Sequence, residues 1–237
     1  MGYPSKKVSS PHAMLEIARK RIPGIEPVNL FGFDPDSGTD WAVIWGNGTF
    51  SFPSSALVMT LVSSSGSDTM SVLVQGLDAN YNVISDVVEL NGITPVTTSI
   101  PFFRINTCII LSGSNVGNIS ITNSGSTHAY ILAGSGVSQA CVYSVPAGHA
   151  LYLFRIDANS GTATGQQYLR IRNVVRTYGG RILRTAQSSF TNVISYDRQI
   201  PFRIAEKSDF WFEAQSSAST NEISIFVEAL LMENNNA

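Results

Sequence analysis

The stretch VQGLDANYNVISDVVEL, residues 74–90, contains two runs of alternating apolar and polar residues on either side of a short polar turn. The turn holds Asp78, Asn80 and Asn82, and these residue types tolerate left-handed backbone angles. Alternation with a period of two is typical of a strand that buries one of its faces. The stretch therefore predicts a β-hairpin, and with it an antiparallel sheet.

The part of the chain that follows contains no Asp, Glu, Lys or Arg between Arg104 and Arg155. Its apolar runs are short and are interrupted by Ser, Gly and Asn, as in TCIILSGSNVGNISITNSG (107–125). A helix that crosses a bilayer needs roughly 20 nearly continuous apolar residues, so this region does not predict a membrane span. Short apolar runs between small polar turns favour further antiparallel strands. Because active sites usually use ionisable side chains, the region favours a surface that assembles over one that catalyses.

Similar strand-like runs, separated by Gly, Ser, Asn and Pro, occupy most of the remaining chain. They lie at 41–45, 56–62, 70–76, 83–90, 102–111, 118–122, 129–134, 143–161, 166–180, 181–190, 200–215 and 222–234. Their number and spacing predict an all-β fold of antiparallel β-sandwich or jelly-roll-like type, either as two β domains or as one extended body. Charged residues become more frequent after about residue 140, so we expect a first sandwich at 27–140 and a second at 141–237.

The N-terminal residues 1–26 are expected to form a helical arm. PHAMLEIARKRI (11–22) has helical periodicity and is followed by Pro23, which ends a helix. The apolar face of this helix consists of Met14, Leu15, Ala18 and Ile22. Residues 24–40 are rich in Pro, Gly and Asp and are expected to be a linker. An arm of this size cannot bury its apolar face alone, so we expect the face to contact a neighbouring subunit.

The composition excludes several classes of protein. Charged residues make up 14% of the chain, hydrophobic residues 43%, and the formal net charge is −2. A hydrophobic content of this size is not that of a disordered chain, and the small charge gives no long-range attraction to nucleic acid. The start MGYPSKKVSS lacks the apolar core of a secretory signal. Cys108 and Cys141 are expected to be small buried hydrophobic residues, with a disulfide between them left open.

Residue patterns predict no catalytic, cofactor-binding or metal-binding residues. His12, His128 and His149 are isolated from one another and lack metal-binding spacing, so each is expected to be structural. No serine lies in a G-x-S-x-G motif, and no glycine run matches a phosphate-binding loop.

A calcium-loop register occurs in the predicted hairpin. Its positions 1, 3, 5 and 12 are Asp78, Asn80, Asn82 and Glu89. Val83 stands where such a loop requires glycine, and the residues after it alternate as in a strand. We therefore expect a hairpin turn without metal.

A stripe of arginines is the second candidate site. In a strand, Arg170, Arg172 and Arg176 project from one face, with Ile171 and Val175 on the other. Such a stripe can bind phosphate or an anionic glycan, but pairing with carboxylates, as a polar sheet face or an assembly interface, is the favoured interpretation. Acidic residues expected on neighbouring strands are Glu206, Asp209 and Glu213.

The run VQGLDANYNVISDVVELNGITPVTT (74–98), followed by FFRIN (102–106) and VGNIS (116–120), resembles a recurring pattern in structural proteins of tailed bacteriophages, especially marine and cyanobacterial ones. The resemblance extends to GFDPDSG before it, and to YSVPAGHALYLF, IPFRIAEKSDFWFEAQ and ISIFVEALLMEN after it, so that it covers most of residues 30–233. It implies a virion structural protein and no catalytic residues.

The sequence thus predicts a non-enzymatic structural component of a tailed-phage virion, assembled in the host bacterial cytoplasm. It would serve as capsid cement or decoration, or as part of the neck or tail. Its expected partners are copies of itself, as a trimer or higher homo-oligomer, and other virion proteins, with no cofactor, membrane or nucleic acid.

The alternative is a receptor-binding tail fibre or knob that recognises host glycan. Such a protein should show exposed aromatic side chains with acid and amide partners in one pocket. Trp41, Trp45 and Trp211 lie in strand-like runs and are expected to pack in cores instead.

Overall fold

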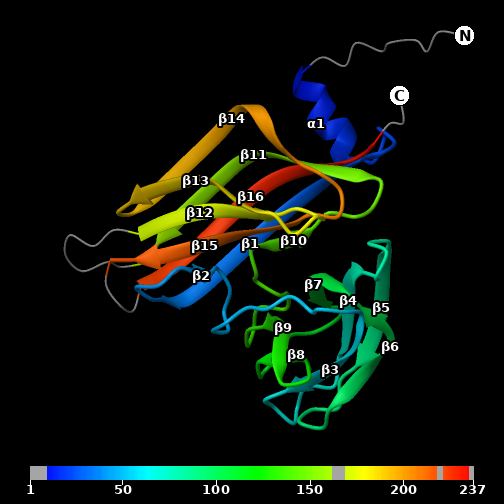
Figure 1. Ribbon diagram of the computed structural model, residues 1–237. Helices are drawn as coiled ribbons and strands as arrows, with labels where there is room; N and C mark the ends of the chain where they lie inside the picture. The colour runs from blue at the N-terminus through cyan, green and yellow to red at the C-terminus, as the bar shows by residue number, and fades with distance from the viewer. Residues whose placement is uncertain (1–9, 162–168, 218–220, 235–237) are drawn as a thin grey trace, which may run out of the picture.

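The computed structural model describes residues 10–161, 169–217 and 221–234, which are coloured in Figure 1. In these residues the chain forms one helix and sixteen strands, and every strand pair is antiparallel. The predicted all-β fold with a short N-terminal helix is therefore confirmed.

The larger of two β-sandwiches consists of two sheets with the strand orders β1-β16-β11-β14 and β10-β15-β12-β13. Its strands are β1 (Ile25–Ser37), β10 (Val142–Ser144), β11 (His149–Ser160), β12 (Leu169–Arg176), β13 (Ile182–Phe190), β14 (Val193–Ile204), β15 (Asp209–Ser216) and β16 (Asn221–Glu233). Counted in chain order as one to eight, these strands are arranged 1-8-3-6 and 2-7-4-5. This is the order of an eight-stranded jelly roll, and we call this part the jelly-roll domain.

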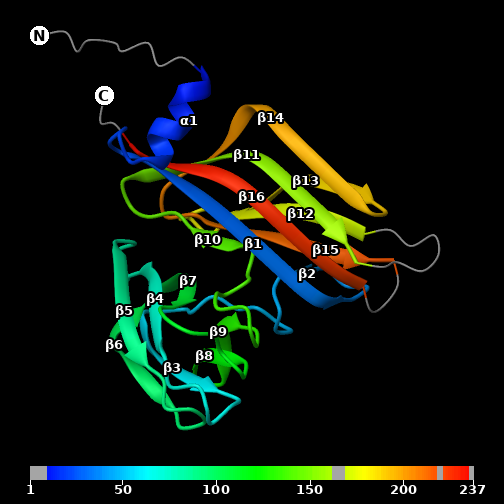
Figure 2. The same cartoon turned by 180° about the vertical axis from the view of Figure 1, so that it is seen from behind.

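The smaller sandwich, which we call the inserted sandwich, has the strand orders β6-β3-β8-β9 and β5-β4-β7. Its strands are β3 (Leu57–Ser63), β4 (Ser71–Leu77), β5 (Val83–Glu89), β6 (Val96–Phe102), β7 (Arg104–Ile110), β8 (Ile119–Asn123) and β9 (Ser126–Ile131). Figure 2 shows it as a separate body below the jelly-roll domain. The short strand β2 (Ala42–Val43) precedes it and pairs with the edge of β15 that β10 leaves open.

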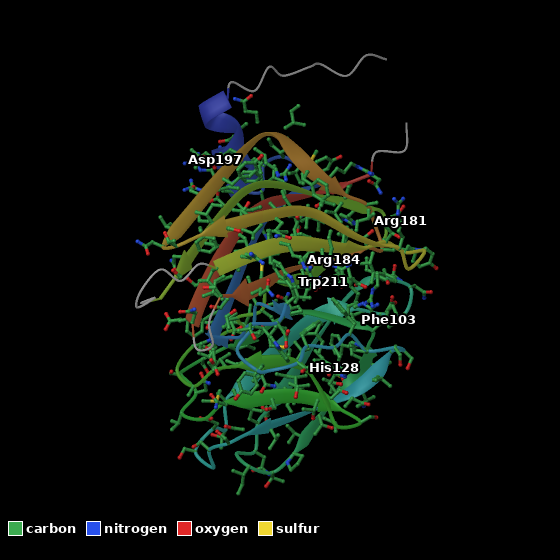
Figure 3. The ribbon with its side chains drawn as sticks, turned by 60° about the vertical axis from the view of Figure 1, so that its left-hand side comes forward. Phe103, His128, Arg181, Arg184, Asp197 and Trp211 are labelled. Carbon is green, nitrogen blue, oxygen red and sulfur yellow. The ribbon has the colours of Figure 1, made fainter. Side chains whose placement is uncertain are left out.

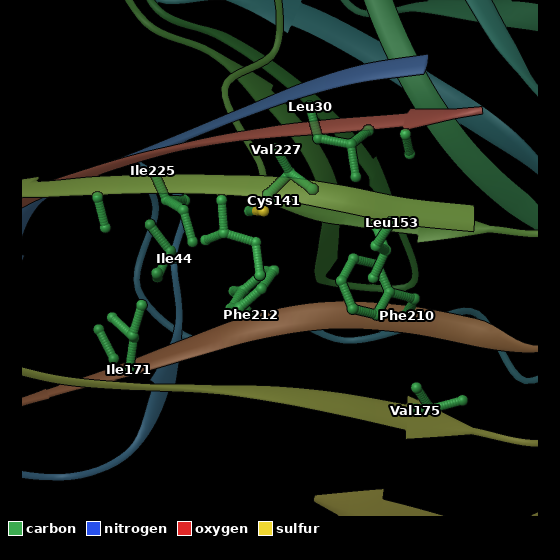
Figure 4. Close-up of a cluster of buried hydrophobic side chains, with 14 of the residues drawn as sticks. Leu30, Ile44, Cys141, Leu153, Ile171, Val175, Phe210, Phe212, Ile225 and Val227 are labelled. Carbon is green, nitrogen blue, oxygen red and sulfur yellow. The ribbon is translucent and has the colours of Figure 1, made fainter. Parts of the chain in front are cut away.

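The core of the jelly-roll domain lies between its two sheets (Figure 4). Leu153 and Val227 from one sheet meet Phe210 and Phe212 from the other. In β16 every second residue is buried, as the alternation of its sequence predicts. Full burial of one large apolar side chain contributes roughly 1.5–3 kcal/mol, so this repeated pattern holds the two sheets together.

The structure divides the chain differently from the predicted boundary at residue 140. Residues 25–37, which were expected to be part of a linker, form β1 and pair with β16 over nearly their whole length. The jelly-roll domain therefore takes its first strand from before the inserted sandwich and its other strands from after it. Pro27 and Pro35 are tolerated because β1 is the edge strand of its sheet.

Helix α1 (Ser10–Ala18) ends four residues earlier than the predicted end at Ile22. The backbone N–H of Lys20 donates to the carbonyl of Ile17, and that of Arg21 donates to the carbonyl of Glu16. Lys20 has a positive φ of 55°. These hydrogen bonds form a Schellman motif, which ends the helix before Pro23 is reached.

The hairpin predicted for residues 74–90 is confirmed, since β4 pairs with β5 from Leu77↔Val83 to Ser71↔Glu89. In its turn the Asp78 carboxylate accepts hydrogen bonds from Asn80 N–H and from the backbone and side chain of Asn82. Glu89 lies at the opposite end of β5, so the calcium-loop register is not brought together.

Candidate functional site

The arginine stripe lies on the face of β12 that points away from the jelly-roll core. Ile171 and Val175 are buried in that core, so the predicted division of β12 into two faces is confirmed. On the other face, the register places Arg170 opposite Gln215, Arg172 opposite Glu213 and Arg176 opposite Asp209, all three on β15.

Each of these arginines has a partner within the same chain. Arg172 Nε donates to Glu213 at 2.6 Å, and Arg176 Nε donates to Asp209 at 2.9 Å. Arg170 donates to the side chain of Gln215 at 3.4 Å. Glu206, the third acid expected near the stripe, instead accepts the backbone N–H of Gly148. The stripe is therefore a paired sheet face.

This face of the jelly-roll domain meets the inserted sandwich, and Asp209 is the centre of the contact, which we call the junction. Asp209 is 2% exposed, and its carboxylate binds Arg104 of β7 at 2.7 Å and 3.2 Å. The Ser144 hydroxyl donates to the same carboxylate at 2.6 Å. With Arg176 as the third donor, both oxygens of Asp209 are fully hydrogen-bonded, so this carboxylate is not free to act as a base or as a metal ligand.

Aromatic rings surround the two guanidinium groups at the junction. Phe52 lies between them, with its ring centre 5.1 Å from the Arg104 guanidinium carbon and 4.6 Å from that of Arg176. The Arg104 guanidinium also lies 3.8 Å from the ring centre of Phe103. Figure 3 shows Phe103 and Trp211 on the two sides of the junction. Such contacts stabilise a cation that burial has separated from water.

Further hydrogen bonds connect the two sandwiches. The Asn106 side chain of β7 donates to the carbonyl of Ser144 and accepts the N–H of the same residue. The Ala147 N–H donates to the carbonyl of Tyr81 at 2.9 Å. Buried hydrogen bonds that are all satisfied give a contact one preferred geometry, so the junction fixes the inserted sandwich against the jelly-roll domain.

The predicted apolar face of the N-terminal helix is mainly exposed. Met14 and Leu15 are 48% and 44% exposed, Ala18 is exposed and Ile22 is half-buried. Ile17, which was not assigned to the predicted face, is buried where α1 packs against β1. The body thus covers one side of the helix and leaves the side with Met14 and Leu15 uncovered.

The histidines and cysteines have structural environments. His128 Nδ1 lies 2.9 Å from the carbonyl oxygen of Ser51, and His149 Nδ1 lies 2.9 Å from that of Ala147. His12 was also expected to be structural, and its side chain lies outside the described side chains. Cys108 and Cys141 are free thiols buried in two different cores, which confirms the expectation of small buried residues and leaves no disulfide between them.

The residues missed from the sequence are Arg104 and two aromatic residues between β2 and β3, Phe50 and Phe52. Arg104 is the last charged residue before the long charge-free region, and it is only 5% exposed. A single charge at the edge of an otherwise uncharged segment was the available signal that this arginine has a specific buried partner.

The fold and the junction define an all-β protein with a jelly-roll domain and a second sandwich inserted after the first strand of that domain. No helix of the described residues has the length and apolar character needed to cross a membrane. Among residues 10–161, 169–217 and 221–234, no group of three or more His, Cys, Asp or Glu side chains is placed to hold a metal ion.

No protein-family model matches the chain, and no curated protein sequence matches it. Among solved structures, the VP2 subviral particle of infectious bursal disease virus is similar with a TM-score of 0.26 and 9% identity, over 91% of this chain and 74% of that chain. The Gt strain of the same virus gives a TM-score of 0.28 and 11% identity, over 94% and 78% of the two chains.

A two-domain protein of unknown function from Bacteroides fragilis NCTC 9343 gives a TM-score of 0.21 and 10% identity, over 93% of this chain and all of that chain. At these TM-scores and identities, the similarities carry no argument about function.

Proposed function

We propose that this protein is a non-enzymatic structural component of a tailed-phage virion, serving as capsid cement or decoration, or as part of the neck or tail. The observation that carries the proposal is the junction, where Asp209 joins two sandwiches into one body through buried hydrogen bonds. A part of a particle must transmit contacts without bending, and a fixed two-sandwich body meets that requirement. The resemblance of residues 74–98 to phage structural proteins gives the biological setting.

The assembly surface in this proposal includes the N-terminal helix. Ile17 anchors the helix to the body, while Met14 and Leu15 extend apolar surface into solvent. Exposed apolar side chains of this size gain free energy when another protein covers them. A homo-oligomer in which each helix contacts a neighbouring copy would bury them, and symmetric homo-oligomers are the usual form of such assemblies.

The test replaces both exposed residues, Met14→Ser and Leu15→Ser, in a phage that carries this gene. The variant should fold with a nearly unchanged melting temperature, because neither side chain packs against a described core cluster. Its copy number in purified particles, measured by quantitative mass spectrometry, should fall severalfold.

The matched control is Arg19→Ser, one residue beyond the end of the helix, where an exposed charged side chain is removed and incorporation should be normal. Normal incorporation of the Met14→Ser, Leu15→Ser variant would show that this helix face is not the assembly contact. A density map of the intact particle that lacks the two-sandwich body would refute the virion role itself.

A further inference from the structure

A pocket of about 590 Å³ opens beside the junction, between the end of β1 and the segment that contains β2. Its volume falls within the range of roughly 300–1,000 Å³ that is usual for small-molecule sites. The side chains that matter to the argument are Asp34, Asp36, Trp41, Asn47, Phe50 and Glu213. Aromatic, acidic and amide groups therefore line one hollow.

Trp41 supplies the flat apolar surface of this pocket. It is half-buried, whereas Trp45 and Trp211 are 2% and 9% exposed, so the expectation that all three pack in cores is wrong for Trp41 alone. The guanidinium carbon of Arg172 lies 4.0 Å from the ring centre of Trp41 and fixes the ring in place. Arg172 in turn is held by Glu213.

Asp34 and Asp36 supply hydrogen-bond acceptors. The Asp36 N–H donates to the Asp34 carboxylate at 3.0 Å, and no ion pair in the described part of the chain involves either carboxylate. Burial raises the pKa of Asp34, and the neighbouring charge of Asp36 acts in the same direction. Each carboxylate oxygen has lone pairs left for hydroxyl donors of a ligand.

The walls of the pocket are fixed before any ligand binds. Trp45 Nε1 donates to the carbonyl of Gly48 at 2.7 Å and closes the turn that carries Asn47. The Phe50 ring packs edge-on against Trp45 with ring centres 5.0 Å apart. Gly48 has a φ of +56°, which favours glycine at the turn. A rigid site loses little conformational entropy on binding.

The charges of the pocket narrow the class of ligand. The carboxylates of Asp34, Asp36 and Glu213 line the pocket and its described lining includes no basic side chain, so an anionic ligand would be repelled. Arg172 covers one face of the Trp41 ring at 4.0 Å from the ring centre, so a ligand cation on the opposite face would share the ring with this guanidinium and be repelled by its charge. An uncharged ring with several hydroxyl groups fits best, because its C–H face can pack on an aromatic ring while its hydroxyls donate to carboxylates.

We propose that this pocket binds an uncharged hexose unit of a saccharide, with Trp41 packing against the sugar ring and Asp34 and Asp36 accepting its hydroxyl hydrogen bonds. The site is independent of the assembly role, since it uses neither the helix nor the Asp209 contacts. A virion component with this site would bind a neutral surface polysaccharide without cleaving it.

The test uses the purified full chain and neutral oligosaccharides of glucose, galactose and mannose, with binding measured by calorimetry and by tryptophan fluorescence. One of these oligosaccharides should bind, and Asp36→Ala and Trp41→Ala should each weaken binding by roughly tenfold, about 1.4 kcal/mol. Asp40→Ala is the matched control, because Asp40 is an exposed neighbouring acid that does not line the pocket. The affinity of this variant for the oligosaccharide should stay within about twofold of that of the unmodified protein.

Two further arms use a sialylated oligosaccharide and tetramethylammonium as probes. Binding of only one of these charged probes, absence of neutral-saccharide binding at millimolar concentration, or equal binding by Asp36→Ala would each overturn the proposal. Release of reducing ends from a bound oligosaccharide would overturn the assignment of a site that binds without cleaving. Because Asp36→Ala leaves the helix unchanged, its incorporation into particles reports separately on the assembly role.

Discussion

Arg104 and Asp209 are 105 positions apart in the chain, yet they form a buried ion pair at 2.7 and 3.2 Å that joins the inserted sandwich to the jelly-roll domain. Their side chains are 6% and 2% exposed. A buried pair of this kind is costly to break, because removal of one partner leaves the other charge buried without compensation. The stability of the two-sandwich body should therefore depend on this contact.

Asp209→Asn should lower the free energy of unfolding by about 3–5 kcal/mol, since Arg104 would lose its buried counter-charge. In urea unfolding at neutral pH, the midpoint should fall clearly. Asp197→Asn is the control: its side chain is 75% exposed and lies 3.7 Å from Arg155, so its loss should cost no more than about 1 kcal/mol. Equal effects of the two substitutions would mean that the junction does not contribute as the buried geometry requires.

Local patterns in the sequence predicted the strands, whereas their long-range partners were not predictable. The alternation in residues 74–90 gave the β4–β5 hairpin correctly, because the two strands are neighbours in sequence. The pairing of β1 with β16 joins segments at opposite ends of the chain, and no local pattern contains that information. Pro27 and Pro35 made β1 resemble a linker, although an edge strand accepts proline.

The residue types of the candidate site and the direction of their side chains could be predicted from the sequence, but the position of the site in the fold could not. The outward direction of Arg170, Arg172 and Arg176 followed from the strand period alone. The pairing of Arg176 with Asp209 depends on the register of β12 with β15, and the contact of Asp209 with Arg104 depends on how the two domains pack. Residue spacing determines neither. Trp41 was misplaced for a similar reason, because its short strand-like run WAVIW forms only the two-residue strand β2 and leaves the tryptophan at a pocket.

Asp68 should make stability depend on pH at the acidic end. Burial raises the pKa of Asp68. Hydrogen bonds from the Ser63 hydroxyl and the N–H groups of Val116 and Gly117 together lower this pKa by more than burial raises it, so the net pKa lies below the usual value of 3.8. A carboxylate with a lowered pKa stabilises the folded state above its unfolded pKa, near 3.9. This contribution is lost as pH falls through the folded pKa.

Asp68→Asn should therefore cost about 1–3 kcal/mol at pH 7, because its amide group would face N–H donors. The difference from the unmodified protein should shrink below about pH 4. Urea unfolding at several pH values measures this difference, with the exposed Asp40→Asn as control. A difference that is constant from pH 7 to pH 3 would contradict the assigned role of the charge.

The two cysteines should not react with thiol reagents while the protein is folded. Both are fully buried, and burial raises the pKa of Cys108 to about 12 and also raises the pKa of Cys141. Since the thiolate is the reactive form, labelling by a disulfide reagent at pH 8 should be negligible in native buffer. In concentrated guanidinium without reductant, two thiols per chain should react. A count of zero there would reveal a disulfide.

Gly76→Ala should disrupt the pairing of β4 with β7, next to the junction. A β-carbon at Gly76 would lie 2.0 Å from the carbonyl oxygen of Arg104, and backbone cannot move aside as a flexible side chain can. β7 would have to shift at the register irregularity beside Gly76, and Arg104 would move with it. Overpacking of this kind costs about 1–3 kcal/mol or more, and displacement of Arg104 from Asp209 should add to the loss.

Gly66→Ala is the matched control, because the added carbon would meet no atom within 4 Å and the glycine has no positive φ. Its free energy of unfolding should stay within about 0.5 kcal/mol of the unmodified protein. The urea midpoint of Gly76→Ala should fall well below that of Gly66→Ala. The double variant Gly76→Ala, Asp209→Asn should lose less than the sum of the two single losses, because a displaced Arg104 no longer depends on the Asp209 carboxylate. Strict additivity of the two losses would show that β7 accommodates the methyl group without displacing Arg104. The packing at Gly76 and the Arg104–Asp209 ion pair would then contribute to stability independently.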